Sequence, residues 1–214
     1  MPLAGEAGKA RGVGRSESQE TCPGAICSPV FEGGTGQVAP SLFIVGGARS
    51  GKSRFASERF SPDTRIVFVA TAEARDEDMI KRIARHRADH PSRWSTIEEP
   101  FELVARLRAL DDAPAGIIVD CLTLWVSNLV LRGDRDDAIL EQADALAGLI
   151  RGARSPLVLV SNEVGEGVHP ETAMGLRFRD LLGHVNQRVA AACETVVLMV
   201  AGIPLAVKGQ VARA

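Results

Sequence analysis

The chain has 214 residues, of which 45% are apolar and 24% charged, and its formal net charge at pH 7 is −2. This composition allows a buried core, which excludes disorder over the whole length. The small negative charge disfavours nucleic acid and anionic membranes as partners. No run of about 18 apolar residues is present, and no apolar stretch follows the basic residues near the N-terminus. We therefore expect a cytoplasmic protein without a membrane span or a secretory signal.

A change in composition near residue 40 predicts where folding begins. Glycine and proline make up 12 of the first 40 residues but only 20 of the remaining 174. Residues 1–40 also lack helical or alternating periodicity, so we predict a disordered N-terminal extension followed by one domain over residues 41–214. Four cysteines are too few for a disulfide scaffold and are expected to be free thiols. They are Cys22, Cys27, Cys121 and Cys193.

Beyond residue 40, short apolar runs alternate with helical patterns. The predicted strands are Leu42–Val45, Arg65–Ala70, Gly116–Asp120, Leu157–Ser161 and Thr195–Ala201. The predicted helices cover 52–60, 76–90, 99–110, 121–131, 134–151 and 175–193. Nearly continuous apolar strands separated by helices indicate an α/β fold with a mostly parallel sheet and helices on both faces. Ligands of such folds bind at the carboxyl ends of the strands.

A phosphate-binding motif follows the first predicted strand. The motif G-x-x-x-x-G-K-[ST] is matched by Gly46, Gly47, Ala48, Arg49, Ser50, Gly51, Lys52 and Ser53. Its glycines allow backbone N–H groups to surround phosphate oxygens at the start of a helix. Lys52 is expected to reach the β- and γ-phosphates, and the hydroxyl of Ser53 to bind Mg²⁺. The motif predicts binding of a nucleoside triphosphate, but it does not distinguish kinases, ATPases and GTPases.

Other polar residues follow the predicted strands. Asp120 ends a buried strand, where a carboxylate can hold Mg²⁺ or cap the next helix. Thr71, Ala72 and Glu73 follow another strand, and we expect them beside the phosphate-binding loop. Thr71 either contacts phosphate or ribose there or belongs to an ordinary strand-to-loop transition.

The residues after the strand Leu157–Ser161 are expected to face the same cleft. Asn162 and Glu163 stand at this point. Glu163 either orients an attacking hydroxyl or a Mg²⁺-bound water, or it fixes the loop by hydrogen bonds. Neither His169 nor His184 has metal-ligand spacing with another histidine or cysteine, and His184 lies on the polar face of its helix.

Residues 75–94 combine acidic and basic clusters around a histidine. Their basic residues include Arg82, Arg85 and Arg87. His86 lies next to both an apolar stripe and a cation, which favour neutral imidazole, the form that can attack an α-phosphorus. The alternative is a solvent-exposed helix whose charges complement the helix dipole.

Several segments together resemble one enzyme family. They read GGARSGKSR from Gly46, RIARHRADHPSRWSTIEEP from Arg82, DCLTLWVSNL from Asp120, SNEVGEGVHP from Ser161 and FRDLLGHVNQRVAAA from Phe178. The chain from Leu42 to Lys208 resembles the bifunctional adenosylcobinamide kinase / adenosylcobinamide-phosphate guanylyltransferase family of cobalamin biosynthesis. The resemblance implies a RecA-like P-loop fold, a homotrimer and a corrinoid substrate.

The resemblance also implies two reactions. The enzyme would phosphorylate adenosylcobinamide with ATP or GTP and then transfer GMP from GTP to that phosphate, giving adenosylcobinamide-GDP. His86 corresponds to the guanylylated histidine and is, with Lys52, a predicted catalytic residue. The other nucleotide contacts would be the P-loop, Thr71, Ala72, Glu73, Arg87, Ala88, Asp89, His90, Glu98 and Asp120. His90 replaces the arginine common at its position.

Three other functions are compatible with parts of the sequence. A small-molecule kinase without the guanylyl step needs only the P-loop and Asp120. A RecA-like DNA-binding ATPase is disfavoured because aromatic residues make up 4% and tyrosine is absent. A nucleotide-sensing module would bind GTP without turning over a corrinoid.

Overall fold

A computed structural model of the chain describes residues 39–73, 91–110, 114–167 and 169–210. Its elements, in chain order, are β1 (Ser41–Gly46), α1 (Lys52–Ser57), β2 (Ile66–Ala70), β3 (Ser95–Glu98), α3 (Leu103–Arg108), β4 (Gly116–Asp120), α4 (Leu122–Arg132), α5 (Asp136–Arg151), β5 (Leu157–Val160), α6 (Ala173–Ala192), β6 (Thr195–Val200) and β7 (Ile203–Lys208). Except for Ala39 and Pro40, the predicted N-terminal extension lies outside these residues, as does the helix predicted over 76–90. No helix within the described ranges is long and apolar enough to cross a bilayer.

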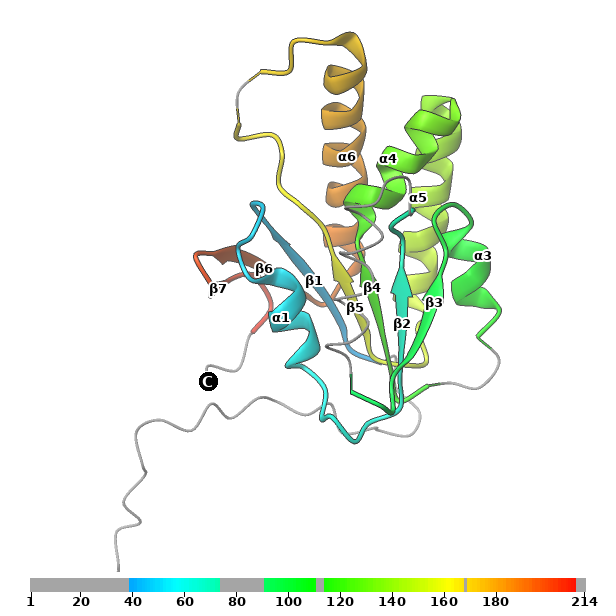
Figure 1. The fold of residues 1–214 in the computed structure, drawn as a ribbon, viewed down its shortest axis with the longest axis vertical. Coiled ribbons are helices and arrows are strands. Elements are labelled where there is room, and N and C mark those ends of the chain that lie inside the picture. The colour runs from blue at the N-terminus through cyan, green and yellow to red at the C-terminus, as the bar shows by residue number, and fades with distance from the viewer. Residues whose placement is uncertain (1–38, 74–90, 111–113, 168, 211–214) are drawn as a thin grey trace, which may run out of the picture.

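The strands form one seven-stranded sheet in the order β3-β2-β4-β5-β1-β6-β7 (Figure 1). Every neighbouring pair is parallel except β6 and β7, which pair antiparallel. Strand β5 therefore lies between β1, which leads into the P-loop, and β4, which ends at Asp120. The expectation that Thr71–Glu73 lie beside the P-loop is wrong, because β4 and β5 separate β2 from β1. Both segments nevertheless lie at the carboxyl edge of the sheet.

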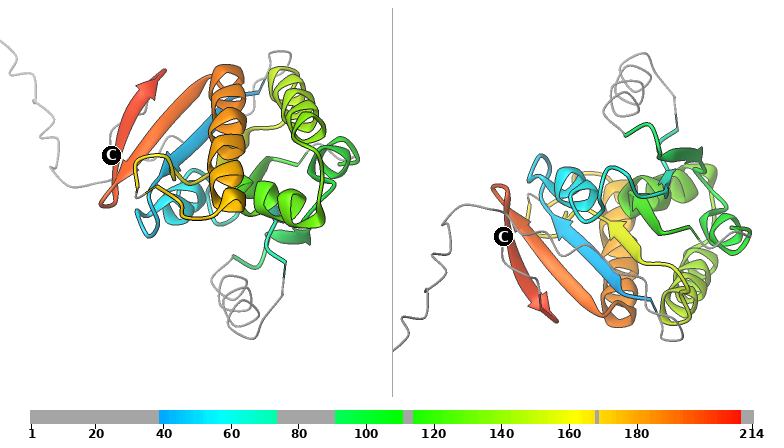
Figure 2. Two further views of the ribbon diagram at one scale, coloured as in Figure 1. Left: turned by 90° about the horizontal axis from the view of Figure 1, so that it is seen from above. Right: turned by 90° about the horizontal axis from the view of Figure 1, so that it is seen from below.

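Helices cover both faces of this sheet (Figure 2). Phe55 and Ala56 of α1 pack on one face with Ile44, Ile118 and Val158. The other face packs against α4, α5 and α6, and its core includes the buried Trp125. Side chains that alternate along β1, β4 and β5 thus enter two different cores, which explains their nearly continuous apolar sequences. The predicted α/β fold class, with a mostly parallel sheet and helices on both faces, is confirmed.

The five predicted strands are present, with ends shifted by at most one residue. Two strands were missed, and both lie at edges of the sheet. Strand β3 is short and partly polar, and β7 contains Pro204 and is exposed along its whole length. The helix predicted over 99–110 begins only at Leu103. Before it, the Glu99 carboxylate accepts the N–H groups of Phe101 and Glu102 at 3.1 and 2.8 Å, which fixes a turn.

Strand β7 caps the C-terminal end of α6 with a lysine. The Nζ of Lys208 donates to the carbonyl oxygens of Ala190 and Ala191, both at 3.0 Å, and of Cys193 at 2.6 Å. Carbonyls at a helix C-terminus lack hydrogen-bond donors within the helix and carry partial negative charge. An ammonium group both donates to them and offsets this charge. Lys208 therefore ties the edge hairpin to the helix that covers the centre of the sheet.

We expect Lys208→Met to lower the free energy of unfolding by about 1–2 kcal/mol, because it removes a charged donor shared by three carbonyls. Lys208→Arg, which keeps the charge and the donors, is the matched control and should lose less. Urea unfolding followed by circular dichroism measures both. A loss below about 0.5 kcal/mol for Lys208→Met, the range of ordinary surface substitutions, would contradict this role.

Candidate functional site

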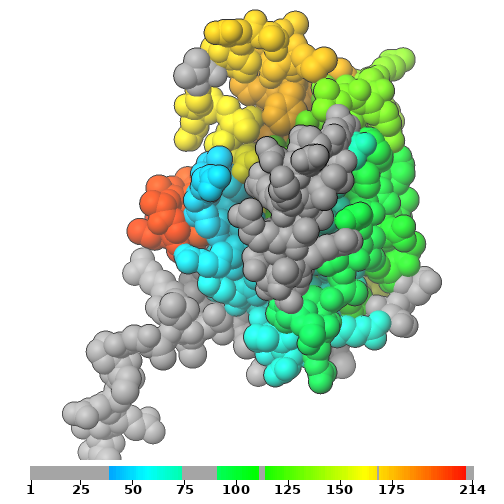
Figure 3. Space-filling view, viewed as in Figure 1, coloured from blue at the N-terminus to red at the C-terminus, as the bar shows by residue number. Residues whose placement is uncertain are grey.

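The P-loop joins the end of β1 to the start of α1, and two of its glycines have backbone conformations that disfavour other residues. Gly46 has φ of 153°, and a Cβ there would lie 2.5 Å from the Met199 carbonyl oxygen of β6. Gly51 has φ of 93° and caps the N-terminus of α1. The turn between β6 and β7 supports the loop, because the Gly202 N–H donates to the Ser50 carbonyl at 3.0 Å. Figure 3 shows the C-terminal hairpin beside the segment that contains the loop.

Lys52 is 8% exposed, and its ammonium group is held by the loop itself. Its Nζ donates to the carbonyl oxygens of Gly46 at 2.8 Å and Gly47 at 2.6 Å, with the Ser50 hydroxyl at 3.5 Å. Each carbonyl has a second donor: the Glu163 N–H lies 3.1 Å from the Gly46 oxygen, and the Ser50 N–H lies 3.3 Å from the Gly47 oxygen. Lys52 can therefore move to a phosphate without leaving a buried carbonyl unpaired.

Two neighbouring groups at the end of β4 act on the charge of Lys52. Burial lowers the pKa of Lys52, whereas negative charge on Cys121 or Asp120 raises it. Burial and the nearby Asp120 raise the pKa of the Cys121 thiol to about 11, so the thiol is protonated at neutral pH. The fold thus brings two predicted site residues, Lys52 and Asp120, within electrostatic range. Cys121 and Cys193 are free thiols, as predicted.

Thr71 fastens the end of β2 to the end of β4. Its side chain is fully buried; the hydroxyl donates to the Cys121 carbonyl at 2.6 Å and accepts the Cys121 N–H at 2.9 Å. The Thr71 N–H donates to the Asp120 carbonyl at 3.2 Å, and the Asn128 side chain donates to the Thr71 carbonyl at 2.8 Å. These bonds fix the backbone around Asp120. A contact from Thr71 to nucleotide stays a prediction, because the described geometry directs its hydroxyl inward.

The other predicted residues from β2 to β4 lie at the same edge. Ala70, the last residue of β2, is in register with Glu98 on β3 and with Asp120 on β4. Glu98 is exposed, and Asp120 is half-buried, as are Ala72 and Glu73. The sheet therefore brings three carboxylates to its carboxyl edge.

Side chains from two helices hold the loop after β5. The Thr123 hydroxyl of α4 accepts the Asn162 N–H at 2.7 Å, and the Asn186 side chain of α6 donates to the Asn162 carbonyl at 3.1 Å. The Glu163 carboxylate accepts the Gly165 N–H of its own loop at 2.7 Å. For Glu163, this geometry favours the loop-fixing interpretation over orientation of a hydroxyl or water.

Sequence reasoning missed the buried polar residues that make these bonds, namely Thr123, Asn128 and Asn186. They are 8%, 5% and 8% exposed, within otherwise apolar faces of α4 and α6. A buried amide requires hydrogen-bond partners, so a polar residue within an apolar helical stripe is the signal that could have identified them.

The predicted magnesium site has two protein ligands, Ser53 in α1 and Asp120 at the end of β4. Within the described ranges, no three His, Cys, Asp or Glu residues form a metal cage. Mg²⁺ ordinarily binds through one or two protein oxygens together with water and substrate phosphates. A hydroxyl beside the P-loop lysine and a half-buried carboxylate therefore fit a phosphate-dependent Mg²⁺ site.

The candidate nucleophile and the site residues predicted around it in sequence lie outside the described residues. These are Arg82, Arg85, His86, Arg87, Ala88, Asp89 and His90. The two histidines after β5 are described, and both are exposed, which confirms the prediction for His184. His169 Nδ1 lies 3.0 Å from the guanidinium of Arg179.

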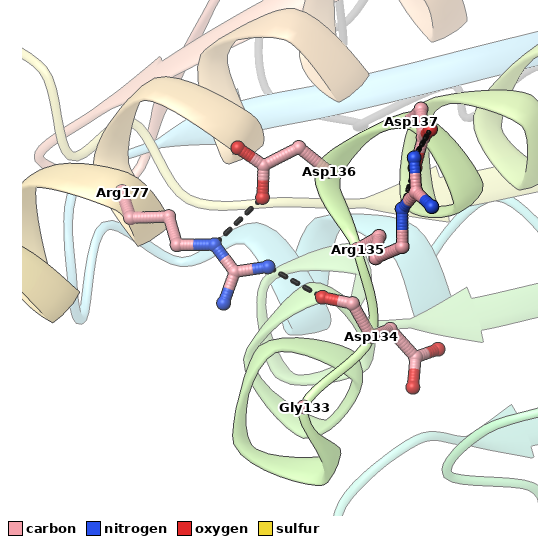
Figure 4. Close-up of a pocket in the computed structure, with 6 residues that line it drawn as sticks. All are labelled: Gly133, Asp134, Arg135, Asp136, Asp137 and Arg177. Atoms are coloured by element: carbon pink, nitrogen blue, oxygen red, sulfur yellow. Dashed lines mark hydrogen bonds and ion pairs between the residues drawn. The ribbon is translucent and has the colours of Figure 1, made fainter.

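A separate cavity of about 540 Å³ lies between the α4–α5 connection and α6 (Figure 4). Each of its charged side chains already has an ionic partner, and that of Asp134 is Arg132 outside the cavity. Arg177 donates to the Asp136 carboxylate at 2.6 Å and to the Asp134 carbonyl, and Arg135 pairs with Asp137. These pairs stabilise the junction of three helices, and no predicted site residue lines the cavity.

The chain matches the model of one protein family over most of its length. A family model described as cobinamide kinase / cobinamide phosphate guanyltransferase matches residues 42–207. The chain belongs to this family. The match spans nearly the segment on which the sequence resemblance rests, so the predicted kinase and guanylyltransferase assignment is confirmed.

Individual relatives agree with the family. The chain is 43% identical to the bifunctional adenosylcobalamin biosynthesis protein CobP of Pseudomonas aeruginosa over 175 residues, or 78% of this chain and 96% of that protein. It is 34% identical to the bifunctional adenosylcobalamin biosynthesis protein CobU of Escherichia coli over 179 residues, or 78% and 99%. Among solved structures, the RadB recombinase gives a TM-score of 0.42 at 15% identity, covering 74% of this chain and 73% of that one.

We expect Gly46→Ala to weaken binding of Mg²⁺-GTP by more than about tenfold, because the new methyl group meets the Met199 backbone and must displace the loop. Gly148→Ala on α5, outside the site, is the control, since a Cβ at Gly148 meets nothing within 4 Å, and its affinity should stay within about threefold of the wild type. Isothermal titration calorimetry measures both dissociation constants. Equal affinities for the two variants would contradict the packing of Gly46 against β6.

Proposed function

We propose that this enzyme phosphorylates adenosylcobinamide with ATP or GTP and then transfers GMP from GTP to that phosphate through a guanylyl-histidine at His86. The observation that carries the proposal is a single family match that includes both the P-loop and the segment containing His86. The proposed nucleotide contacts are the P-loop residues 46–53, Thr71, Ala72, Glu73, Arg87, Ala88, Asp89, His90, Glu98 and Asp120.

The kinase step depends mainly on positioning and charge. Backbone N–H groups of the P-loop and the Lys52 ammonium bind the β- and γ-phosphates, after Lys52 leaves the carbonyls of Gly46 and Gly47. Ser53 and Asp120 would hold Mg²⁺, which would supply positive charge to the phosphate oxygens. The corrinoid hydroxyl oxygen bonds to the γ-phosphorus while the bond to the β–γ bridging oxygen breaks, ADP or GDP leaves, and the hydroxyl proton passes to water.

The guanylyl step has two displacements. An imidazole nitrogen of His86 bonds to the α-phosphorus of GTP, and the bond to the α–β bridging oxygen breaks with release of pyrophosphate. A phosphate oxygen of adenosylcobinamide phosphate then bonds to the same phosphorus while the P–N bond breaks, giving adenosylcobinamide-GDP and free His86. Arg82, Arg85 and Arg87 are the proposed cations near the α-phosphate.

Incubation with Mg²⁺ and GTP labelled at the α-phosphorus tests the covalent step. We expect the denatured wild-type chain to carry an acid-labile, alkali-stable label that is absent from His86→Ala. His184→Ala is the matched control, because His184 is exposed on α6, and it should label like the wild type. An unlabelled wild type that still binds GTP would instead support the alternative, a P-loop small-molecule kinase without the guanylyl step.

The proposed homotrimer is supported by an uncovered apolar face on the C-terminal hairpin. Val200 and Leu205 are each 50% exposed, Ile203 is 63% exposed and Val207 is 65% exposed. Val200 and Leu198 of β6 pair directly with Ile203 and Leu205 of β7, so these side chains form one surface on the edge of the sheet. Such a surface is typical of an interface between subunits.

We expect Leu205→Glu to convert the trimer into a monomer, because a carboxylate would have to be desolvated at the interface. Leu131→Glu is the matched control: Leu131, on α4 away from the hairpin, is also 50% exposed, so its substitution should leave the assembly unchanged. Size-exclusion chromatography with multi-angle light scattering gives both masses. A monomeric wild type would contradict the proposed trimer. A trimeric Leu205→Glu variant would show that the interface does not lie on the hairpin.

A further inference from the structure

Resting on the proposed kinase step, we propose that Asn162 is a further catalytic residue whose side-chain amide donates a hydrogen bond to an oxygen of the transferred γ-phosphoryl group. Asn162 lies at the carboxyl edge of the sheet, on a hydrogen-bonded backbone and with an available side chain.

Asn162 stands between the two strands that carry the phosphate-binding groups. The hydrogen-bond ladder between β5 and β1 continues past the end of β5, since the Ser161 N–H donates to Ile44 at 2.9 Å and the Glu163 N–H donates to Gly46 at 3.1 Å. On the other side, Val160 is in register with Asp120 of β4. Asn162 therefore follows β5 at the carboxyl edge, level with Gly46 of the P-loop on one side and two positions beyond the partner of Asp120 on the other.

The alternation of side chains along this extended segment assigns Asn162 to the face of α1. Val158 and Val160 belong to the core beneath α1, whereas the Ser161 hydroxyl contacts Thr123 of α4 at 3.3 Å. The next residue in the alternation returns to the α1 side. Lys52 is the first residue of α1, so Asn162 and the P-loop lysine share one face of the sheet edge.

Both backbone polar groups of Asn162 are hydrogen-bonded, while its side-chain amide remains available. The Thr123 hydroxyl holds the Asn162 N–H at 2.7 Å, and the Asn186 amide holds the Asn162 carbonyl at 3.1 Å. Within the described ranges, the half-buried side chain of Asn162 makes no hydrogen bond. Its neighbours differ, because the Ser161 hydroxyl and the Glu163 carboxylate both contact groups of the protein. Asn162 alone of these three presents an unused donor on a fixed backbone.

An amide donor suits the charge that develops in phosphoryl transfer. The corrinoid hydroxyl oxygen bonds to the γ-phosphorus, the bond to the β–γ bridging oxygen breaks, ADP leaves and the hydroxyl proton passes to water. In the loose transition state, negative charge is spread over the three equatorial oxygens of the phosphoryl group. A preorganised neutral donor stabilises this charge, and loss of one such donor typically costs about 10²–10³-fold in kcat.

The test compares Asn162→Ala with Gln187→Ala, which removes an exposed amide from α6. Initial rates with adenosylcobinamide and ATP give kcat and KM, and labelling with GTP at the α-phosphorus measures His86 guanylylation in the same preparations. We expect Asn162→Ala to lower the kinase kcat by about 10²-fold. KM for ATP should change by less than about threefold, and guanylylation should stay near the wild-type level. Gln187→Ala should match the wild type throughout.

Asn162→Asp is the second variant, for use if Asn162→Ala fails to fold. It keeps the shape of the side chain but removes the donor, so its kinase kcat should fall by at least about 10²-fold. A kinase kcat within threefold of the wild type for either folded variant would overturn the inference. Equal losses in kcat, ATP affinity and guanylylation would also overturn it, because they indicate a disrupted loop. A wild-type enzyme without kinase activity would refute the proposed kinase step itself, and this inference with it.

Discussion

The buried ammonium group of Lys52 carries a positive charge, and the rest of the site is organised around that charge. The Gly46 and Gly47 carbonyls accept its ammonium group at 2.8 and 2.6 Å, and Asp120 lies within electrostatic range. A buried ammonium without such partners would be strongly destabilising. The P-loop is thus supported by its own backbone, and in the proposed kinase step phosphate would replace these partners of Lys52.

Buried polar side chains extend this support to the neighbouring strands. Thr71 joins β2 to β4, while Thr123 and Asn186 join the loop after β5 to α4 and α6. The Glu163 N–H then connects that loop to Gly46, which also accepts Lys52. Because these bonds are buried or partly buried, the loops at the sheet edge are held with little freedom. Such rigidity suits phosphoryl transfer, which depends on positioning more than on covalent chemistry.

Local patterns in the sequence were sufficient for the central strands and the P-loop, because both depend on residues close together in the chain. Strand β7 was missed because Pro204 and its exposed residues lack the pattern of a buried strand. The strand order was not predictable from these patterns, and β2 was consequently expected too close to β1. Likewise, the bonds of Thr71 and Asn186 join elements far apart in sequence. The role of His86 came from the family resemblance.

The strand order has a consequence for how the chain is made. Strand β1 is the first strand to leave the ribosome, yet its neighbours are β5 and β6, whose pairing residues come more than a hundred positions later. At about 5–20 residues per second, β1 waits roughly 6–23 s for β5, with unpaired edges and an apolar sequence. During that interval the nascent chain is vulnerable to intermolecular strand pairing, and a chaperone that shields β1 would raise the yield of folded enzyme.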